Sequence, residues 1–326
     1  MTPQKLERYL KRFSRANVLV VGDLILDHYI WGQVHRVSPE APVPVVHVQS
    51  ETLSLGGAAN VFKNLKSLGG QADLCGVIGA DESGRSFLKE LSNYRRNRSG
   101  IVMDAERPTT RKTRIIAHNQ QIVRYDVEEP ELLSPSIERK ILRYVGSRLS
   151  EVTCLVISDY DKGVVTPSLM THLRALASRH EVPIVVDPKV KHFEYYSDVT
   201  VITPNHVEAY QAAGLRANSN HPINEVGPLL RKRLNCKAVL VTRGEHGMSL
   251  FEENQAHWHI PAMARQVYDV TGAGDTVVST LALALSVGAS IKEAAVLANR
   301  AAGVVVGMLG TASVTPPQLK EALTHD

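Results

Sequence analysis

The residues best suited to chemistry lie in the run Asp269-Val270-Thr271-Gly272-Ala273-Gly274-Asp275, directly before an apolar helical stretch. Glycines at a helix start leave several backbone N–H groups facing one point, which favours an anion. The carboxylate of Asp275 can take a proton from an attacking hydroxyl while the N–H groups hold a phosphoryl group. An isolated Asp here would more often be a helix cap. The two glycines and the second acid, Asp269, make capping an incomplete account, so the pattern predicts phosphoryl transfer.

A second glycine site, Leu55-Gly56-Gly57-Ala58-Ala59-Asn60, also precedes a helical stretch. A glycine pair lets the backbone approach a ligand closely, and Asn60 adds a donor and an acceptor. A tight turn between a strand and a helix would explain the same glycines, and this motif alone does not decide between the two. Neither site is a dinucleotide or P-loop fingerprint, since Val277 replaces a required glycine and no Gly-Lys-Ser/Thr follows. These absences disfavour a nicotinamide dehydrogenase and a P-loop ATPase.

Short β-branched runs alternate with helical stretches along most of the chain, which predicts a mostly parallel sheet with helices on both faces. We expect strands at Val18–Val21, Leu74–Ile78, Cys154–Ile157, Ile184–Val186, Val199–Ile202, Ala238–Thr242 and Met248–Phe251. We expect helices at Leu6–Phe13, Asn60–Leu68, Ser83–Leu91, Ser134–Leu149, Pro167–Ser178, Asn205–Ala213, Pro222–Leu234, Ala273–Val287, Ile291–Gly307 and Pro317–Leu323.

Two segments break this alternation. Residues 28–48 show no helical period and contain three prolines, and residues 109–126 are typical of two strands around a turn at Asn119-Gln120. We therefore expect one α/β domain over residues 1–326, with a small β lid formed by insertions at about 28–48 and 107–126.

The charge of the chain is concentrated in the second of these insertions. The 326 residues carry 37 Lys and Arg against 33 Asp and Glu, a net charge of +4 that does not predict a nucleic-acid partner. Residues 107–126 hold five basic side chains and one acid. They form either a solvated face or a pocket for a phosphate group. A two-residue turn would put Lys112 and Arg114 on one face and Arg111 and Arg124 on the other, and a one-residue slip would change that grouping.

Cysteine spacing and hydropathy limit the compartment. Cys75, Cys154 and Cys236 are about 80 residues apart, with no metal or disulfide pattern. No apolar run approaches the roughly 18 residues of a membrane helix. We expect a cytoplasmic protein without a membrane partner.

The two glycine motifs and Thr203-Pro204-Asn205-His206-Val207-Glu208 resemble the signatures of the ribokinase family of carbohydrate kinases, in that family's order. The resemblance runs from Val18 to about Pro316 and implies a ribokinase-like fold with a lid. The run Ser-Pro-Glu-Ala-Pro-Val-Pro-Val-Val from Ser38 is similar to the branch that phosphorylates the anomeric hydroxyl of D-glycero-β-D-manno-heptose 7-phosphate with ATP, for the lipopolysaccharide core. Four further segments share this similarity: Gly22–Asp27, Asn119–Gln121, Ser158–Gly163 and Asp187–Lys189.

The resemblance implies a role for each matching residue. Asp275 would be the general base, and the anion hole would comprise Gly272, Ala273 and Gly274. Sugar hydroxyls and the substrate phosphate would be held by Asp27, which we place at the end of the first strand, and by Gly56, Gly57, Asn60, Lys112, Arg114 and Arg124. The nucleotide would lie against Lys189, Asn205, Glu208, Thr242, Gly244 and Asn299. Mg²⁺ would be held through water by Asn205, Glu208 and Asp187.

Several expectations stay open at this point. Asp269 and Thr271 match one side of a K⁺ site found in many family members, whereas the facing loop near Leu309–Ser313 is less clear. Family members often form homodimers through their lids. Another sugar kinase acting on a hexose, a ketosugar acid or ribose is the alternative enzyme, and a sugar-sensing protein on the same fold is the non-enzymatic one. Length does not distinguish a stand-alone kinase from one domain of a bifunctional enzyme.

Overall fold

The computed structural model describes residues 3–94, 98–118, 120–217, 221–253, 255–263, 268–308 and 312–324. Within these ranges a nine-stranded sheet forms the centre, in the order β13-β12-β11-β10-β9-β8-β1-β4-β5. Its strands are β1 (Asn17–Gly22), β4 (Gln71–Gly79), β5 (Ile101–Asp104), β8 (Cys154–Ser158), β9 (Ile184–Asp187), β10 (Val201–Ile202), β11 (Ala238–Thr242), β12 (Met248–Glu252) and β13 (Trp258–Ile260). The pairing is parallel except at one edge, where β12 is antiparallel to both of its neighbours, β11 and β13.

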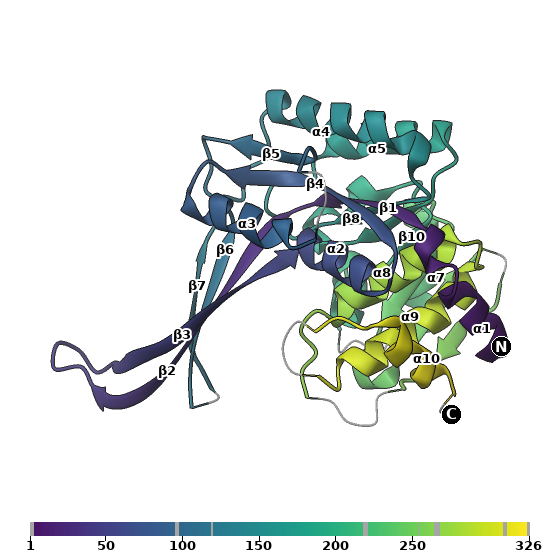
Figure 1. The fold of residues 1–326 in the computed structure, drawn as a ribbon. Helices are drawn as coiled ribbons and strands as arrows, with labels where there is room; N and C mark the ends of the chain where they lie inside the picture. The colour runs from purple at the N-terminus through teal and green to yellow at the C-terminus, as the bar shows by residue number, and fades with distance from the viewer. Residues whose placement is uncertain are drawn as a thin grey trace.

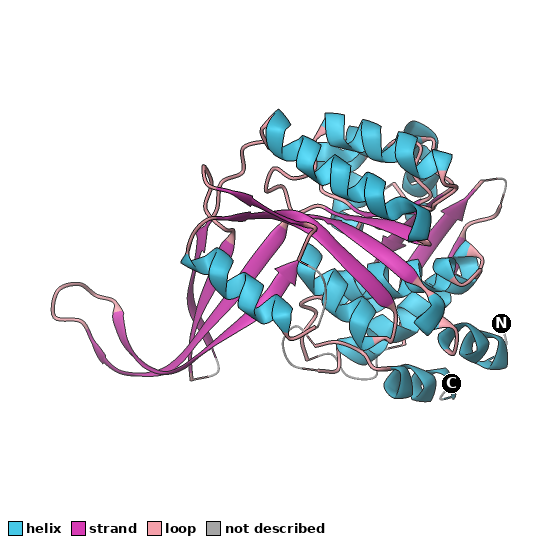
Figure 2. Ribbon diagram, turned by 45° about the horizontal axis from the view of Figure 1, so that its top comes forward, coloured by secondary structure: helices cyan, strands magenta, loops and turns pink. Residues whose placement is uncertain are grey.

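Helices cover both faces of this sheet (Figures 1 and 2). One face carries α1 (Pro3–Leu10), α2 (Ala58–Ser67), α3 (Glu82–Ser92), α8 (Ala273–Ser286), α9 (Ile291–Val305) and α10 (Pro316–Thr324). The other carries α4 (Pro135–Arg148), α5 (Pro167–Arg179), α6 (His206–Ala212) and α7 (Ile223–Leu234). Short 3-10 helices lie at η1 (Phe13–Arg15), η2 (Leu149–Glu151), η3 (Val190–Tyr196) and η4 (Gly244–His246).

The sequence of β1 shows why the sheet has two covered faces. Val18 and Val20 pack in the core with α2 and α8, whereas Leu19 and Val21 pack in the core with α4 and α5. Successive side chains of a strand point to opposite faces, so a continuous apolar run needs a hydrophobic layer on each side.

A separate four-stranded sheet in the order β3-β2-β6-β7 forms the lid. Its strands are β2 (Leu24–Val37), β3 (Pro44–Gly57), β6 (Arg111–Ala117) and β7 (Gln120–Val127). The hairpin β2–β3 extends well beyond the other lid strands (Figure 1), because β6 pairs with β2 only from Leu26 to Gly32.

Two details of the lid correct the sequence analysis. Asp27 does not end the first strand: β1 stops at Gly22 and Asp27 lies in β2, because the chain turns into the lid sheet at Leu24. The turn between β6 and β7 also differs from the two-residue turn at Asn119-Gln120. A register shift between Ile115 and Ile116 places Arg124 opposite Arg114 and Lys112 opposite Asp126. The three cations therefore share one face, as the one-residue slip predicts; Asn119 lies outside the described residues.

The helices and main-sheet strands expected from the sequence are present, with bounds that differ by three residues or fewer, whereas the first lid insertion is longer than expected and runs from Leu24 to Gly57. Strand β5 was not predicted. No helix of the described ranges is long and apolar enough to cross a membrane. The three cysteines are free and buried.

Two helical glycines with different surroundings give a test of the core packing. A Cβ at Gly227 in α7 would lie 2.1 Å from Cδ2 of Phe251, whereas a Cβ at Gly146 in α4 would meet nothing within 4 Å. Gly227→Ala should lower the free energy of unfolding by about 1–3 kcal/mol through overpacking. Gly146→Ala should raise it by about 0.5–1 kcal/mol, since alanine is the better helix former. Urea unfolding of both variants measures this, and a stabilised Gly227→Ala would contradict the packing.

Candidate active site

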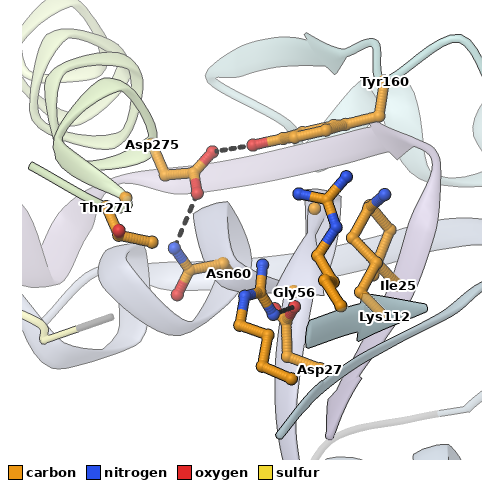
Figure 3. A pocket seen from close by; sticks show the side chains of 12 residues that line it. Ile25, Asp27, Gly56, Asn60, Lys112, Tyr160, Thr271 and Asp275 are labelled. Atoms are coloured by element: carbon orange, nitrogen blue, oxygen red, sulfur yellow. Dashed lines mark hydrogen bonds and ion pairs between the residues drawn. The ribbon is translucent and has the colours of Figure 1, made fainter. Parts of the chain in front are cut away.

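A cavity of about 230 Å³ lies where the lid meets the main sheet (Figure 3). It is lined by Ile25, Asp27, Gly56, Gly57, Asn60, Lys112, Arg114, Arg124, Tyr160, Thr271, Gly272 and Asp275. All of these except Ile25 and Tyr160 are site residues expected from the sequence. The two glycine motifs, which are more than 200 residues apart, thus meet at one cavity with the basic face of the lid.

Asp275 is buried in the first turn of α8, and both of its carboxylate oxygens are held (Figure 3). The Tyr160 hydroxyl donates to Oδ1 at 2.9 Å, and Nδ2 of Asn60 donates to Oδ2 at 2.6 Å. Burial raises the pKa of Asp275 to about 6, although the two hydrogen bonds oppose the rise. At neutral pH the carboxylate is therefore mostly ionised and able to accept a proton.

Asn60 is fixed by the helix pair beneath the cavity. Thr276 of α8 donates to Oδ1 of Asn64 at 3.0 Å, and Nδ2 of Asn64 donates to the carbonyl oxygen of Asn60. The Oδ1 atom of Asn60 is buried and has no hydrogen-bond partner among the described residues. Burial of an acceptor without a hydrogen-bond donor costs free energy. This atom is therefore suited to accept a hydrogen bond from a hydroxyl group of a bound molecule.

The start of α8 presents backbone donors to the same cavity. Gly272 is its N-cap, with a left-handed φ of 79°. The N–H of Ala273 donates to the carbonyl oxygen of Val270. The N–H groups of Gly274 and Asp275 lie in the first turn of the helix, where no preceding turn supplies a carbonyl acceptor. They can therefore bind an anion. A Cβ at Gly274 would meet nothing within 4 Å, so the space beside this residue is open, although Ala273 and Gly274 do not themselves line the cavity.

The glycines of the first motif have packing reasons of their own. A Cβ at Gly56 would lie 2.1 Å from Oδ2 of Asp27, and Gly57 has a φ of +58° where β3 turns into α2. The turn explanation and the ligand explanation are therefore compatible: the glycines make the turn that places Asp27 and Asn60 at the cavity.

The lid cations are paired with carboxylates. Arg114 contacts Oδ1 of Asp27 at 2.6 Å, and Lys112 contacts Oδ2 of Asp126 at 2.9 Å. Arg124 lies 3.2 Å from Oδ1 of Asp126, and its side chain remains 49% exposed. Of the three, Arg124 is the most accessible to a ligand in the cavity.

On the other side of Tyr160, acidic groups gather at the ends of β9 and β10. Asn205 and Glu208 form a capping box at the start of α6, and Oε1 of Glu208 lies 3.6 Å from Nζ of Lys189. Burial, followed by the charges of Asp275 and Glu208, raises the pKa of Asp187 well above its usual value. Lys189 supplies one positive charge to these carboxyl groups, and a divalent cation would supply more.

Within the described ranges, no three or more His, Cys, Asp or Glu side chains are arranged to hold a metal ion by themselves.

The remaining expected residues lie outside the cavity lining. Thr242 pairs with Asn205 as an isolated bridge, and Gly244 opens η4 with a φ of +56°. Asn299 of α9 donates to the carbonyl oxygen of Pro261 at 2.8 Å. Asp269 accepts from the N–H of Thr271. The facing loop near Leu309–Ser313 falls largely outside the described residues.

Sequence reasoning assigned no role to Asp23 or Tyr160. Asp23 is buried and accepts from the N–H groups of Tyr160, Lys162 and Val164. Those residues lie in the loop after β8, and the hydrogen bonds fix the backbone that carries Tyr160. The signal was present, because Asp23 and Tyr160 both belong to segments similar to the heptose kinase branch, but their pairing is visible only in three dimensions.

Comparison with known proteins gives one family. Residues 15–318 match the model described as pfkB family carbohydrate kinase. "Bifunctional protein HldE" of Geobacter sulfurreducens is 42% identical over 323 residues, covering 99% of this chain and 66% of the relative. The protein of the same name from Trichlorobacter lovleyi is 43% identical, with 99% and 66% covered. The chain thus spans about two thirds of the length of these curated relatives.

Solved structures share the fold at low sequence identity. Arabidopsis thaliana ribokinase complexed with ribose and ATP has a TM-score of 0.73 at 18% identity, covering 95% of this chain and 99% of that one. Escherichia coli phosphofructokinase-2 in complex with potassium has a TM-score of 0.77 at 17% identity, covering 95% and 98%. The fold is ribokinase-like, as the sequence resemblance implies.

Proposed function

Because the chain belongs to the pfkB family of carbohydrate kinases, we propose that it transfers the γ-phosphoryl group of ATP to the anomeric hydroxyl of D-glycero-β-D-manno-heptose 7-phosphate, giving the 1,7-bisphosphate. One observation carries the proposal: a buried carboxylate, Asp275, lies between a helix N-terminus suited to phosphate and a lid face that bears three cations. The choice of sugar is supported by the 42–43% identity to the HldE proteins. It is also supported by the segments of the sequence that are similar to the heptose kinase branch.

In the proposed reaction Asp275 is the general base. Its carboxylate takes the proton of the 1-hydroxyl as that oxygen attacks the γ-phosphorus, and the bond from this phosphorus to the bridging oxygen of ADP breaks. The N–H groups at the start of α8 stabilise the charge on the transferring group. Asn60 holds the sugar through its unpartnered Oδ1. Positioning and charge neutralisation therefore account for most of the rate.

The nucleotide side uses residues that lie beyond the cavity lining. Lys189 would bind the triphosphate, and Thr242, Gly244 and Asn299 would contact the nucleoside. Asp187, Asn205 and Glu208 would hold Mg²⁺ through water, and the ion would neutralise charge on the phosphates. K⁺ at Asp269 and Thr271 belongs to the same proposal, but no step depends on it.

The setting follows from the same chemistry. We propose that residues 1–326 act as one kinase domain in the cytoplasm, where ATP is available and where buried free cysteines stay reduced. Another sugar kinase of the family remains the alternative enzyme, and it would leave the paired lid cations without a phosphate to bind. A sugar sensor would have no use for the buried base.

Asp275→Asn tests the base. The amide keeps the shape of the side chain but cannot take a proton, so kcat should fall by about 10²- to 10⁴-fold. ATP should bind with unchanged Kd in isothermal titration calorimetry, because the proposed phosphate-binding groups, the backbone N–H groups of α8 and the side chain of Lys189, are unaltered. Substantial remaining turnover would exclude Asp275 as the base.

Arg124→Gln tests the phosphate pocket. Removing a charged hydrogen-bond donor should raise KM for the heptose 7-phosphate by about 10- to 100-fold. The rate with the same sugar lacking its phosphate should not change. Arg139→Gln, which removes an exposed charge from α4, is the matched control. Equal losses with both sugars would show that Arg124 does not read the phosphate.

The outer face of the lid supports a homodimer. Leu53, Val123, Tyr125 and Val127 are exposed, and their register places them on the face opposite the lid cations. Exposed apolar side chains on a sheet favour association.

We expect a dimer at micromolar concentration in sedimentation equilibrium, and Tyr125→Asp should shift it towards monomer. Leu229→Asp, on exposed α7, should leave the mass unchanged. A monomeric wild-type protein would refute the lid dimer.

A further inference from the structure

Tyr160 connects the two halves of the candidate site. Its hydroxyl donates to Oδ1 of Asp275 at 2.9 Å, and Nζ of Lys189 lies 5.4 Å from the centroid of its ring. Its backbone N–H donates to Oδ2 of Asp23 at 2.7 Å. The side chain of Tyr160 thus contacts both the proposed base and the proposed triphosphate-binding lysine. Its backbone is held by the hydrogen bond to Asp23.

We propose that Tyr160 is a positioning residue that sets both the orientation and the basicity of Asp275. The inference rests on the proposed function, in which Asp275 is the base. Asn60 holds one carboxylate oxygen and Tyr160 holds the other (Figure 3). With both oxygens hydrogen-bonded, rotation of the carboxylate is restrained at the cavity that Asp275 lines.

The hydroxyl is a donor at every pH at which the enzyme works. Burial, followed by the charge of Asp275, raises the pKa of Tyr160 well above its usual value. The phenol therefore stays protonated and stabilises the ionised form of Asp275. It lowers the pKa of Asp275 against the effect of burial and keeps the base available near neutral pH.

Other charged groups around Asp275 act in both directions. Asp27 of β2 raises its pKa, and Lys63 of α2 lowers it. Asp187 at the end of β9 is a further acid close enough to interact with it. None of these groups changes when only the Tyr160 hydroxyl is removed, so Tyr160→Phe isolates its effect.

The ring has a second role that can be separated from the first. Lys189 lies against its face in a cation–π contact, which is worth more when the groups are desolvated. Tyr160→Phe keeps the ring and this contact. Tyr160→Leu removes the ring and the hydroxyl together.

The experiment measures the pKa of Asp275 directly by ¹³C NMR of carboxyl-labelled aspartate in the full chain without ligands. The Asp275→Asn spectrum identifies the signal. Loss of one hydrogen bond to the carboxylate should raise this pKa by about 1 unit in both Tyr160 variants. The control is Tyr9→Phe, which removes a phenol that donates to the carboxylate of Glu293; it should leave the signal of Asp275 unmoved.

The kinetic readout follows the same shift. The acidic limb of kcat/KM for the sugar should lie near pH 6 in the wild-type enzyme and about 1 unit higher in Tyr160→Phe, because the base must be ionised to act. KM for ATP should rise only in Tyr160→Leu, which loses the contact with Lys189. A merely structural role would lower kcat/KM at all pH values without moving the limb.

The outcomes separate the inference from the function on which it rests. An unchanged pKa of Asp275 in folded Tyr160→Phe overturns the positioning role, whatever the substrate. If the protein does not phosphorylate heptose 7-phosphate but the pKa shifts, the choice of substrate fails and the link between Tyr160 and Asp275 stands. Should Tyr160→Phe fail to fold, Tyr160→Leu gives the same titration, and an unshifted value there overturns the proposal equally.

Discussion

The site depends on one buried carboxylate, Asp23, which sits directly after the first strand. Its side chain accepts from three backbone N–H groups of the loop after β8, its N–H donates to the carbonyl oxygen of Ser158, and its own carbonyl oxygen accepts from the N–H of Ala58. Burial, then the charge of Asp159, raises the pKa of Asp23 to about 6, and the N–H donors oppose this. A single residue thereby joins the end of β1, the loop of Tyr160 and the start of α2. Since Tyr160 and Asn60 come from these two segments, the placement of Asp275 is indirectly set by Asp23.

The lid holds several cations close together, and their mutual repulsion has to be balanced. Arg114 faces Arg124 across the β6–β7 pair, and like charges directly opposite repel. Asp27 and Asp126 relieve this repulsion by pairing with them. Under the proposed function, the phosphate of the substrate would compete with these two carboxylates for the cations, which an unphosphorylated sugar would not do.

Local motifs predicted much of the site, and long-range geometry limited the rest. The helix start at Gly272–Asp275 and the turn at Gly56-Gly57 are each formed by a short segment of the chain. The glycines in these segments indicate both features in the sequence. The face of Arg124 depended on a register shift between Ile115 and Ile116, which no residue type marks. Asp27 was assigned to the end of the first strand because the start of the lid strand at Leu24 has the same apolar character as β1, and the residue types do not mark the turn between the two strands. Tyr160 and Asp23 were missed because each is meaningful only through a partner more than 100 residues away.

The continuity of β2 and β3 has a mechanical consequence. Asp27, Gly56 and Gly57 occupy the inner ends of the same two strands that run out to the tip of the hairpin. The inner part is reinforced by β6 as far as Gly32, whereas the outer part is a two-stranded ribbon with register irregularities at Trp31/Gly32 and Val34/Arg36. The inner part of the hairpin is therefore stiffer than the outer part. Bending of the hairpin should concentrate at these irregularities, so that a displacement of its tip leaves Asp27 and the two glycines at the inner ends in place.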